Sequence, residues 1–245
     1  MTPVLEKISA HRSIRKFSDR PVDTDLLTSL ITAAQCTSTS HHVQAYTIIQ
    51  VTDPANRQKI ADMAGPQPWV AAAPVFLVFC ADLTRLVDAC RHNTVAPETG
   101  WAEQLLVATV DTALLAQSLM LGAESAGLGG VFIGGIRNDP ELVCDLLHIP
   151  EHAFPVFGMC LGYPNEDPAP KPRLPLNLIF HQDRFPETVN DRELAAYDDI
   201  IQAYYEKRAP KLRDRTWTRQ MAEFTGQVIR PHMKSFLEQK KFFKH

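Results

Sequence analysis

The sequence predicts a single domain of the α+β class. Short continuous apolar runs typical of strands and segments with helical periodicity follow one another without strict alternation, which favours α+β. The chain has 245 residues, 45% of them hydrophobic, which is enough for a sizeable core. We therefore expect one domain over residues 1–245, with residues 190–245 as a C-terminal helical excursion.

The N-terminal part of the chain predicts three helices and two strands. Asp53 and Pro54 illustrate a helix start, since the carboxylate can cap the first turn and proline fits its first position. Residues 75–80 form a continuous apolar run, typical of a strand that is buried on both faces. In order, we expect a helix over residues 3–10, a helix over 23–36, a strand over 46–51, a helix over 53–64 and a strand over 75–80.

Residues 101–126 give the longest helical pattern, and Gly127 stands where a left-handed C-cap is expected. This helix is apolar on nearly every side, which predicts burial all round. One small domain covers such a helix poorly, which favours a dimer whose partner supplies the missing cover. Asp111 lies near its centre and argues against a membrane-spanning helix.

The rest of the chain predicts two further strands and several helices. Asp139 and Pro140 again have the pattern of a helix start. Residues 164–175 contain five prolines and should form an extended loop. In order, we expect a strand between the glycine pairs of 129–135, a helix over 139–147, a strand over 156–161, and helices over 191–207, 218–227 and 231–239.

Composition limits the possible functions. The formal net charge of −3 argues against a dedicated nucleic-acid binder. The five cysteines are odd in number and form no C-x-x-C pair, which predicts a reducing compartment without a disulfide framework. The first residues lack the apolar run of a secretory signal. We therefore expect a cytoplasmic protein with no membrane partner.

The segment His11-Arg12-Ser13-Ile14-Arg15 is the first candidate site. Guanidinium groups match phosphate oxygens with paired hydrogen bonds. In an extended segment His11, Ser13 and Arg15 share one face, which would make an anion cradle. A solvated basic turn with no ligand is the alternative.

Two further features could belong to the same site. Lys171-Pro172-Arg173 would point both cations the same way if extended, unless it is only a rigid surface loop. Gly134-Gly135 after a strand would let backbone N–H groups approach a flat ligand, unless the pair serves close packing. Residues 127–132 lack the third glycine of G-x-G-x-x-G, and no P-loop motif is present.

The basic loop over residues 207–215 holds five cations in nine residues. It could capture the 2′-phosphate of NADPH, or it could be a solvated loop. The pairs His41-His42 and His148…His152 lack a further ligand at a recognised spacing, so we expect no metal. No G-x-S-x-G elbow is present, which disfavours a hydrolase triad.

These features, in this order, resemble the oxygen-insensitive NADPH nitroreductase and flavin reductase P branch of the nitroreductase superfamily. The resemblance covers essentially the whole chain. It rests on HRSIRKF at 11–17, the Ser/Thr run and Gln44 at 37–44, DTALLAQSLMLGAESAGLGGVFIGGIRN at 111–138, FGMCLGYP at 157–164 and KPRLP at 171–175. It implies a central mixed β-sheet flanked by helices and an intertwined homodimer with FMN at the interface.

The resemblance also implies site residues. The FMN phosphate and ribityl chain would be held by His11, Arg12, Ser13, Arg15, Lys171 and Arg173. Thr39, Ser40 and Gln67 would contact the chain or ring edge, and Glu103 would lie near the flavin. Ile133, Gly134 and Gly135 would lie against the isoalloxazine. The NADPH and acceptor mouth, shaped by residues 190–245, would include His42, Arg208, Arg213 and Arg230.

The expected activity is a ping-pong, two-electron reduction of nitroaromatics, quinones or similar flat acceptors by NADPH, with NADH a poorer donor. No catalytic side chain is expected, because FMN itself carries the hydride. Release of reduced flavin as the product is one alternative, and a non-catalytic flavin-binding protein is another. His42 stands where the family has an aromatic ring, so the physiological acceptor stays open.

Overall fold

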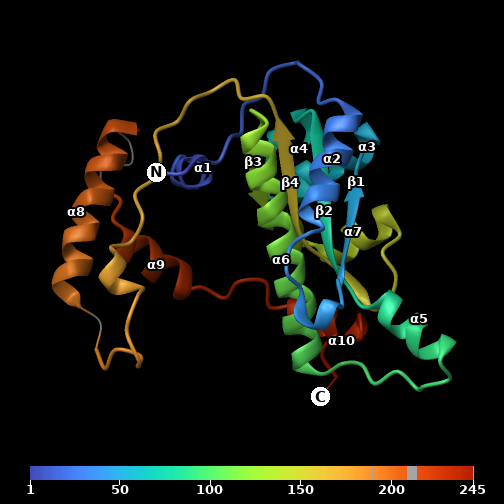
Figure 1. Ribbon diagram of the computed structural model, residues 1–245. Helices are drawn as coiled ribbons and strands as arrows, with labels where there is room; N and C mark the ends of the chain where they lie inside the picture. The colour runs from blue at the N-terminus through green and yellow to red at the C-terminus, as the bar shows by residue number, and fades with distance from the viewer. Residues whose placement is uncertain (189, 209–213, 245) are drawn as a thin grey trace. The chain divides into compact units, whose positions relative to one another are not determined.

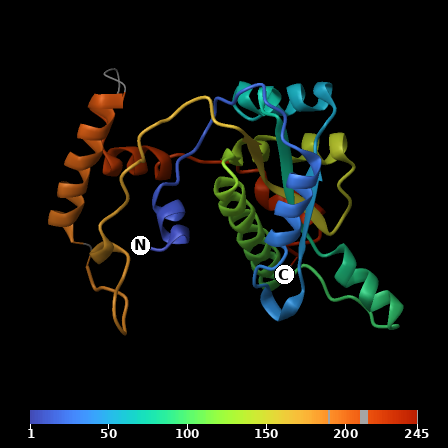
Figure 2. The ribbon, with the colours of Figure 1, turned by 45° about the horizontal axis from the view of Figure 1, so that its top comes forward.

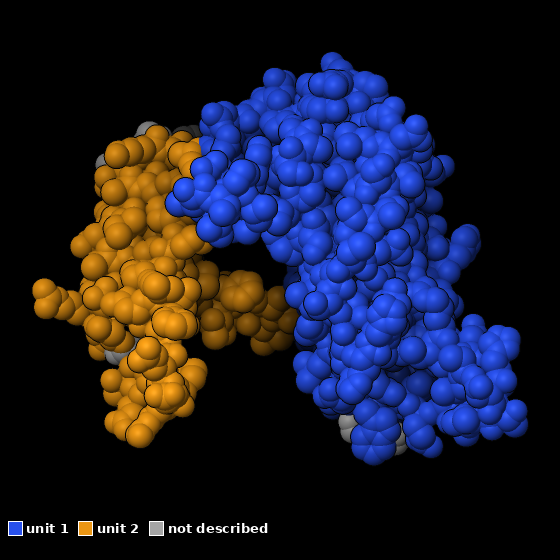
Figure 3. All heavy atoms as spheres, viewed as in Figure 1, with its two compact units in different colours: residues 1–168, 230–245 blue, residues 169–229 orange. Residues whose placement is uncertain are grey.

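The computed structural model describes residues 1–188, 190–208 and 214–244. They divide into two compact units, coloured separately in Figure 3. The first unit comprises Met1–Pro168 and Arg230–His245, and the second comprises Ala169–Ile229. The second unit therefore begins earlier than the excursion expected from residue 190, and the C-terminal residues belong to the first unit.

The first unit contains a sheet, eight α-helices and two 3₁₀ turns among its described residues. The strands are β1 (Tyr46–Gln50), β2 (Val75–Asp82), β3 (Gly129–Ile133) and β4 (Ala153–Gly162). The helices are α1 (Pro3–Ser9), α2 (Thr24–Ala34), α3 (Pro54–Met63), α4 (Pro68–Ala72), α5 (Thr84–His92), α6 (Ala102–Ser125), α7 (Pro140–Leu147) and α10 (Met233–Gln239). The 3₁₀ turns are η1 (Ser40–His42) and η2 (Gly134–Asn138).

The second unit contains η3 (Leu176–Leu178), α8 (Asp191–Arg208) and α9 (Trp217–Thr225). Residues 164–175 form no helix or named strand, as five prolines predict. Two helices of the first unit, α4 and α5, lie where the sequence pattern predicts no helix.

Capping residues begin three helices where the sequence predicts them. Asp23 accepts hydrogen bonds from the backbone of Asp25 and Leu26, and so begins α2. Asp53 caps α3 and Asp139 caps α7 in the same way. After α6, Gly127 has φ +81°, the left-handed conformation expected beyond a helix end.

The sheet has the strand order β1-β2-β4-β3. Every pair of neighbouring strands is antiparallel, with one irregularity in β2 between Phe79 and Cys80. The mixed sheet that we expected therefore has no parallel pair in the described part of the chain. The apolar pattern of a strand predicts its burial but says nothing about the direction of its neighbours.

Both faces of the sheet are covered, and β2 is buried along its whole length, as predicted. Phe76 and Val78 point into one core cluster, which includes residues of α3, α4, α7 and α10. Leu77 and Phe79 point into the other, with α2 and α6. Figures 1 and 2 both show α2 beside α6 on that face.

Helix α6 is buried on one side only, so the expectation of burial all round is wrong for the isolated chain. Leu115 and Leu119 are fully buried, whereas Leu106, Val110 and Leu114 are 59%, 51% and 42% exposed. By length and composition α6 is the one helix in the described residues that could cross a membrane, and 39% of that window is buried within the structure. A core helix that packs on a sheet passes the same test.

Candidate functional site

The His11–Arg15 segment is anchored on β3. Ile14 is 3% exposed, and its backbone N–H donates to the carbonyl of Gly130 at 2.9 Å. A Cβ on Gly129 would lie 2.6 Å from Cγ1 of Ile14, so the close approach needs glycine there. Ser13 is half-buried and Arg15 exposed, which is the alternation that an extended segment gives around a buried residue.

Two cationic side chains of this segment contact carboxylates. Nδ1 of His11 lies 2.6 Å from Oε1 of Glu124, at the end of α6. The guanidinium of Arg12 forms an ion pair with Asp167 in the proline-rich loop. Both groups therefore bind anionic oxygen in this structure.

The backbone of the segment also binds an anion. The consecutive N–H groups of Arg15 and Lys16 donate to the same oxygen, Oε1 of Glu166, at 2.6 and 3.0 Å. Successive N–H groups pointing at one oxygen form a concavity suited to anions. The Arg15 guanidinium lies 5.7 Å from the Trp69 ring centroid, and Arg15, Lys16 and Trp69 help to line a cavity of about 920 Å³.

The two glycines after β3 have different surroundings. A Cβ on Gly135 would lie 2.1 Å from the Ala64 carbonyl and 2.6 Å from Nε2 of Gln67, so this glycine serves close packing. A Cβ on Gly134 would meet only the guanidinium end of Arg137, at 3.4 Å. Gln67 thus lies beside Gly135, whereas the side chain of Ile133 is fully buried in the core.

Arg230 reaches the end of η2. Its Nε donates to Oδ1 of Asn138 at 3.0 Å, and the nearby His232 ring contacts the Arg137 carbonyl at 3.0 Å. Burial lowers the pKa of Arg137, and the charge of Arg230 lowers it further. Arg230, which we predicted to lie at the acceptor mouth, therefore contacts the η2 turn that contains Gly134 and Gly135.

The predicted residues Thr39, Ser40 and His42 lie on a loop beside β1. Thr39 precedes the η1 turn in an extended conformation, and His42 is exposed with φ +59°. Ser40 donates its N–H to Oδ1 of the buried Asp111 in α6 at 3.0 Å. This hydrogen bond therefore connects the loop to helix α6.

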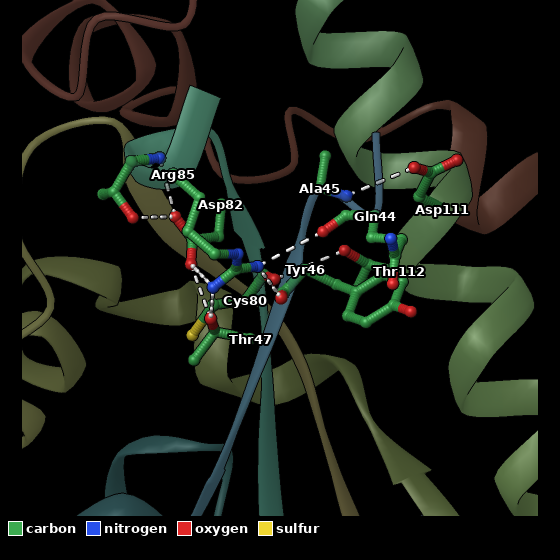
Figure 4. A network of polar contacts seen from close by, with 10 residues as sticks. Gln44, Ala45, Tyr46, Thr47, Cys80, Asp82, Arg85, Asp111 and Thr112 are labelled. Carbon is green, nitrogen blue, oxygen red and sulfur yellow. Dashed lines mark hydrogen bonds and ion pairs between the residues drawn. The ribbon is translucent and has the colours of Figure 1, made fainter. Parts of the chain in front are cut away.

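A polar network secures the other side of this loop (Figure 4). Arg85 forms an ion pair with Asp82 at 3.1 Å and donates to the carbonyls of Gln44 and Tyr46. Burial by itself would raise the pKa of Asp82, but hydrogen bonds from Thr47 and Thr84 and the charge of Arg85 hold it below its ordinary value. Burial, followed by the charge of Asp111, raises the pKa of Tyr46.

In the second unit, α8 holds the Lys171-Pro172-Arg173 segment. The hydroxyl of Tyr197 donates to the Pro172 carbonyl at 2.9 Å, and Nζ of Lys171 lies 5.6 Å from the Tyr205 ring centroid. Lys171 and Arg173 are exposed. That Lys171 and Arg173 bind the same phosphate as the His11–Arg15 segment stays a prediction.

Three other predicted residues lie apart from these contacts or outside the described residues. Arg208, at the end of α8, donates to the hydroxyl of Tyr204 and lies over its ring. Arg213 lies outside the described residues. Glu103 is exposed in the first turn of α6, where an acidic side chain is also favoured by the helix dipole.

Four carboxylates near the site were missed by sequence reasoning. Glu166 and Asp167 precede Lys171 in the proline-rich loop, and Glu124 stands near the end of a long apolar helix. Asp111 interrupts that apolar helix, which was a signal that we used only against a membrane span. Each carboxylate accepts a hydrogen bond from, or pairs with, a residue that is far away in the sequence.

Family comparisons agree with the motifs. Residues 8–163 match the nitroreductase family, and residues 171–245 match its C-terminal domain. The oxygen-insensitive NADPH nitroreductase of Salmonella typhimurium is 41% identical over 237 residues, which is 97% of each chain. The NADPH-flavin oxidoreductase of Vibrio harveyi is 38% identical and covers 98% of each chain.

Solved structures give the same answer for the fold. Nitroreductase A from Vibrio parahaemolyticus aligns with a TM-score of 0.93 at 36% identity, covering 100% of both chains. The NADPH:FMN oxidoreductase from Vibrio harveyi, complexed with NAD⁺, aligns with a TM-score of 0.91 at 36% identity over 100% of both chains. The α+β fold is thus of the nitroreductase type, and the chain belongs to the nitroreductase family.

Proposed function

We propose that the chain is an FMN-dependent oxidoreductase that uses NADPH to reduce nitroaromatics, quinones or similar flat acceptors in two-electron steps. The observation that carries the proposal is the set of anion-binding donors on residues 11–16, anchored on the strand that leads to Gly134. The relatives named NADPH nitroreductase and NADPH-flavin oxidoreductase match nearly the whole chain and support the cofactor and the electron donor.

The donors of this segment fit a phosphate. They already bind the carboxylates of Glu124, Glu166 and Asp167, and a phosphate offers the same kind of charged oxygen acceptor. We assign the FMN phosphate and ribityl chain to His11, Arg12, Ser13 and Arg15. The resemblance alone assigns Lys171 and Arg173 to the same group.

The remaining residues would bind the ring and the substrates. Thr39, Ser40 and Gln67 would contact the ribityl chain or ring edge, and the backbone of 133–135 would face the ring. When bound, FMN supplies the hydride acceptor and donor, so the protein needs no nucleophile of its own. Arg208 would bind the 2′-phosphate of NADPH. Arg230 and His42 would lie beside the bound acceptor.

We also propose a homodimer. Leu106, Val110 and Leu114 form one exposed apolar stripe along α6, since residues four apart lie on the same side of a helix. Such a stripe supports contact with a second copy. The five free cysteines fit the cytoplasmic location that the sequence predicts.

The visible absorption spectrum of the purified protein, recorded before and after anaerobic NADPH, tests the function. We expect a bound flavin whose colour is bleached by NADPH and restored by a nitroaromatic or a quinone. A bound flavin that NADPH leaves unchanged would support a non-catalytic flavin-binding protein instead. Oxygen consumption during turnover with a nitroaromatic would contradict two-electron transfer.

The relative named NADPH-flavin oxidoreductase favours a second function, the release of reduced flavin as a product. Turnover rates with free FMN and with a quinone separate the two activities. A clearly faster reaction with free FMN would make flavin reduction the main one.

A further inference from the structure

Asp111 is a buried carboxylate in the middle of α6 that the proposed function does not use. It is 1% exposed, and a charge in that position is tolerated only when hydrogen bonds satisfy it. Oδ1 accepts from the N–H of Ser40 at 3.0 Å, and Oδ2 accepts from the N–H of Ala45 at 3.2 Å. Both contacts lead to a single loop, residues 40–45.

This loop has an unusual backbone. His41, His42 and Gln44 have φ values of +46°, +59° and +52°. In the left-handed region the Cβ of an ordinary residue crowds its own carbonyl, so each of these conformations costs free energy. Contacts from outside must therefore hold the loop in this shape.

The peptide group between Gln44 and Ala45 is held at both ends. Its N–H donates to Asp111, and its carbonyl accepts from Nη2 of Arg85 at 3.2 Å. Figure 4 shows Asp111 and Arg85 on either side of this peptide. Holding this peptide fixes ψ of Gln44 and φ of Ala45, the two dihedral angles on either side of it, at the point where the loop joins β1.

The side chain of Gln44 contacts His42 and so connects it to the held peptide. Nε2 of Gln44 lies 3.2 Å from Nε2 of His42 and 3.4 Å from its carbonyl oxygen. Ser40 thus bonds to the Asp111 carboxylate directly, and His42 is connected to it through the side chain of Gln44 and the N–H of Ala45.

We propose that Asp111 is a positioning residue that fixes the loop of residues 40–45 and thereby holds Ser40 beside the flavin and His42 at the acceptor side of the flavin site. The proposal rests on the proposed function for its last step only, because the hold of Asp111 on the loop is a property of the protein alone. Asp111 itself touches neither the acceptor nor the cofactor in this proposal.

Asp111→Asn tests the hold directly. The amide keeps the shape but presents an NH₂ group to one of the two backbone N–H donors. We expect hydrogen exchange in the peptide that spans residues 40–45 to become about tenfold faster or more, as the loss of a hydrogen bond to a charged group allows. In turnover, the KM for a quinone should rise about tenfold while the KM for NADPH stays within about twofold.

Thr112→Val is the matched control. Thr112 is the next residue of α6 and fully buried, but its hydroxyl bonds to the carbonyls of Ala108 and Cys80 instead of the loop. It should lower stability without changing exchange in residues 40–45. Arg85→Met is a second test in case Asp111→Asn fails to fold, because Arg85 is a largely exposed side chain that holds the same peptide.

Unchanged exchange of residues 40–45 in the Asn and Met variants would overturn the proposal, and so would an equal effect of Thr112→Val. Faster exchange with an unaltered quinone KM would overturn the acceptor role. If NADPH fails to bleach the wild-type flavin, the proposed function fails, while the exchange result still decides whether Asp111 holds the loop.

Discussion

At the scale of single residues, the two glycines after β3 have different surroundings, of which only those of Gly135 require glycine for packing. Gly135 faces the Ala64 carbonyl so closely that no side chain fits. Gly134 meets only the end of the Arg137 side chain, which can move. The packing interpretation therefore applies to Gly135, and the approach of a flat ligand to Gly134 stays a prediction.

Replacement of either glycine by alanine should separate these roles. Gly135→Ala should lower the free energy of unfolding by about 1–3 kcal/mol, because the methyl group overlaps backbone. Gly134→Ala should leave stability nearly unchanged and weaken FMN binding, if the ring lies on this backbone. Denaturant unfolding and FMN titration measure the two effects, and equal losses of stability would contradict the assignment.

At the scale of elements, α8 determines the conformation of the Lys171-Pro172-Arg173 segment. Tyr197 is 3% exposed and donates to the Pro172 carbonyl, between the two cations. Burial raises the pKa of Tyr197, which keeps its hydroxyl protonated and able to donate, and the charge of Arg173 opposes that rise. A helix that follows the segment in sequence thus presets its backbone.

Tyr197→Phe should weaken FMN binding about three- to tenfold, because the Pro172 carbonyl loses its partner and the segment gains freedom. Tyr205→Phe is the control, since its hydroxyl contacts Gln220 and its ring remains under Lys171. The dissociation constant for FMN, from fluorescence titration, checks both variants. Equal weakening in the two would show that α8 acts only through general stability.

At the scale of the whole molecule, the exposed stripe of α6 decides whether the chain acts alone. The side of α6 that packs on the sheet is closed by α2 and β2, and the opposite side leaves Leu106, Val110 and Leu114 exposed. Because these side chains are about half exposed, burying the rest of each would favour association by about 1 kcal/mol. The apolar composition of this helix is therefore explained by two interfaces, one internal and one proposed.

Val110→Glu should dissociate the proposed dimer, because it places a charge at the centre of the stripe. Light scattering after gel filtration should report a shift from the dimer mass to the monomer mass at micromolar concentration. Val95→Glu is the control, since Val95 is 56% exposed but lies outside α6. A monomeric wild type, or a variant that stays dimeric, would rule out this interface.

Local signals in the sequence were enough for most elements. Asp23, Asp53 and Asp139 begin their helices because a carboxylate needs only the next few N–H groups. Helix α5 was missed because its cap stands one residue early, where Asp82 accepts from the N–H and hydroxyl of Thr84. The direction of the strands could not be predicted, because pairing joins segments far apart in the chain.

The sequence by itself determined the family, through motifs along the whole chain. It also determined the four strands, most of the helices and the cationic segment at 11–15, since each of these depends on residues close together in the chain. Only the tertiary structure decided which groups those residues meet. Glu124 and Glu166 reach residues 11–16 across long separations, and Asp111 reaches Ser40 and Ala45 from another element. The physical reason is that a buried or paired charge is satisfied by whatever donors packing brings near, and the sequence pattern does not encode that proximity.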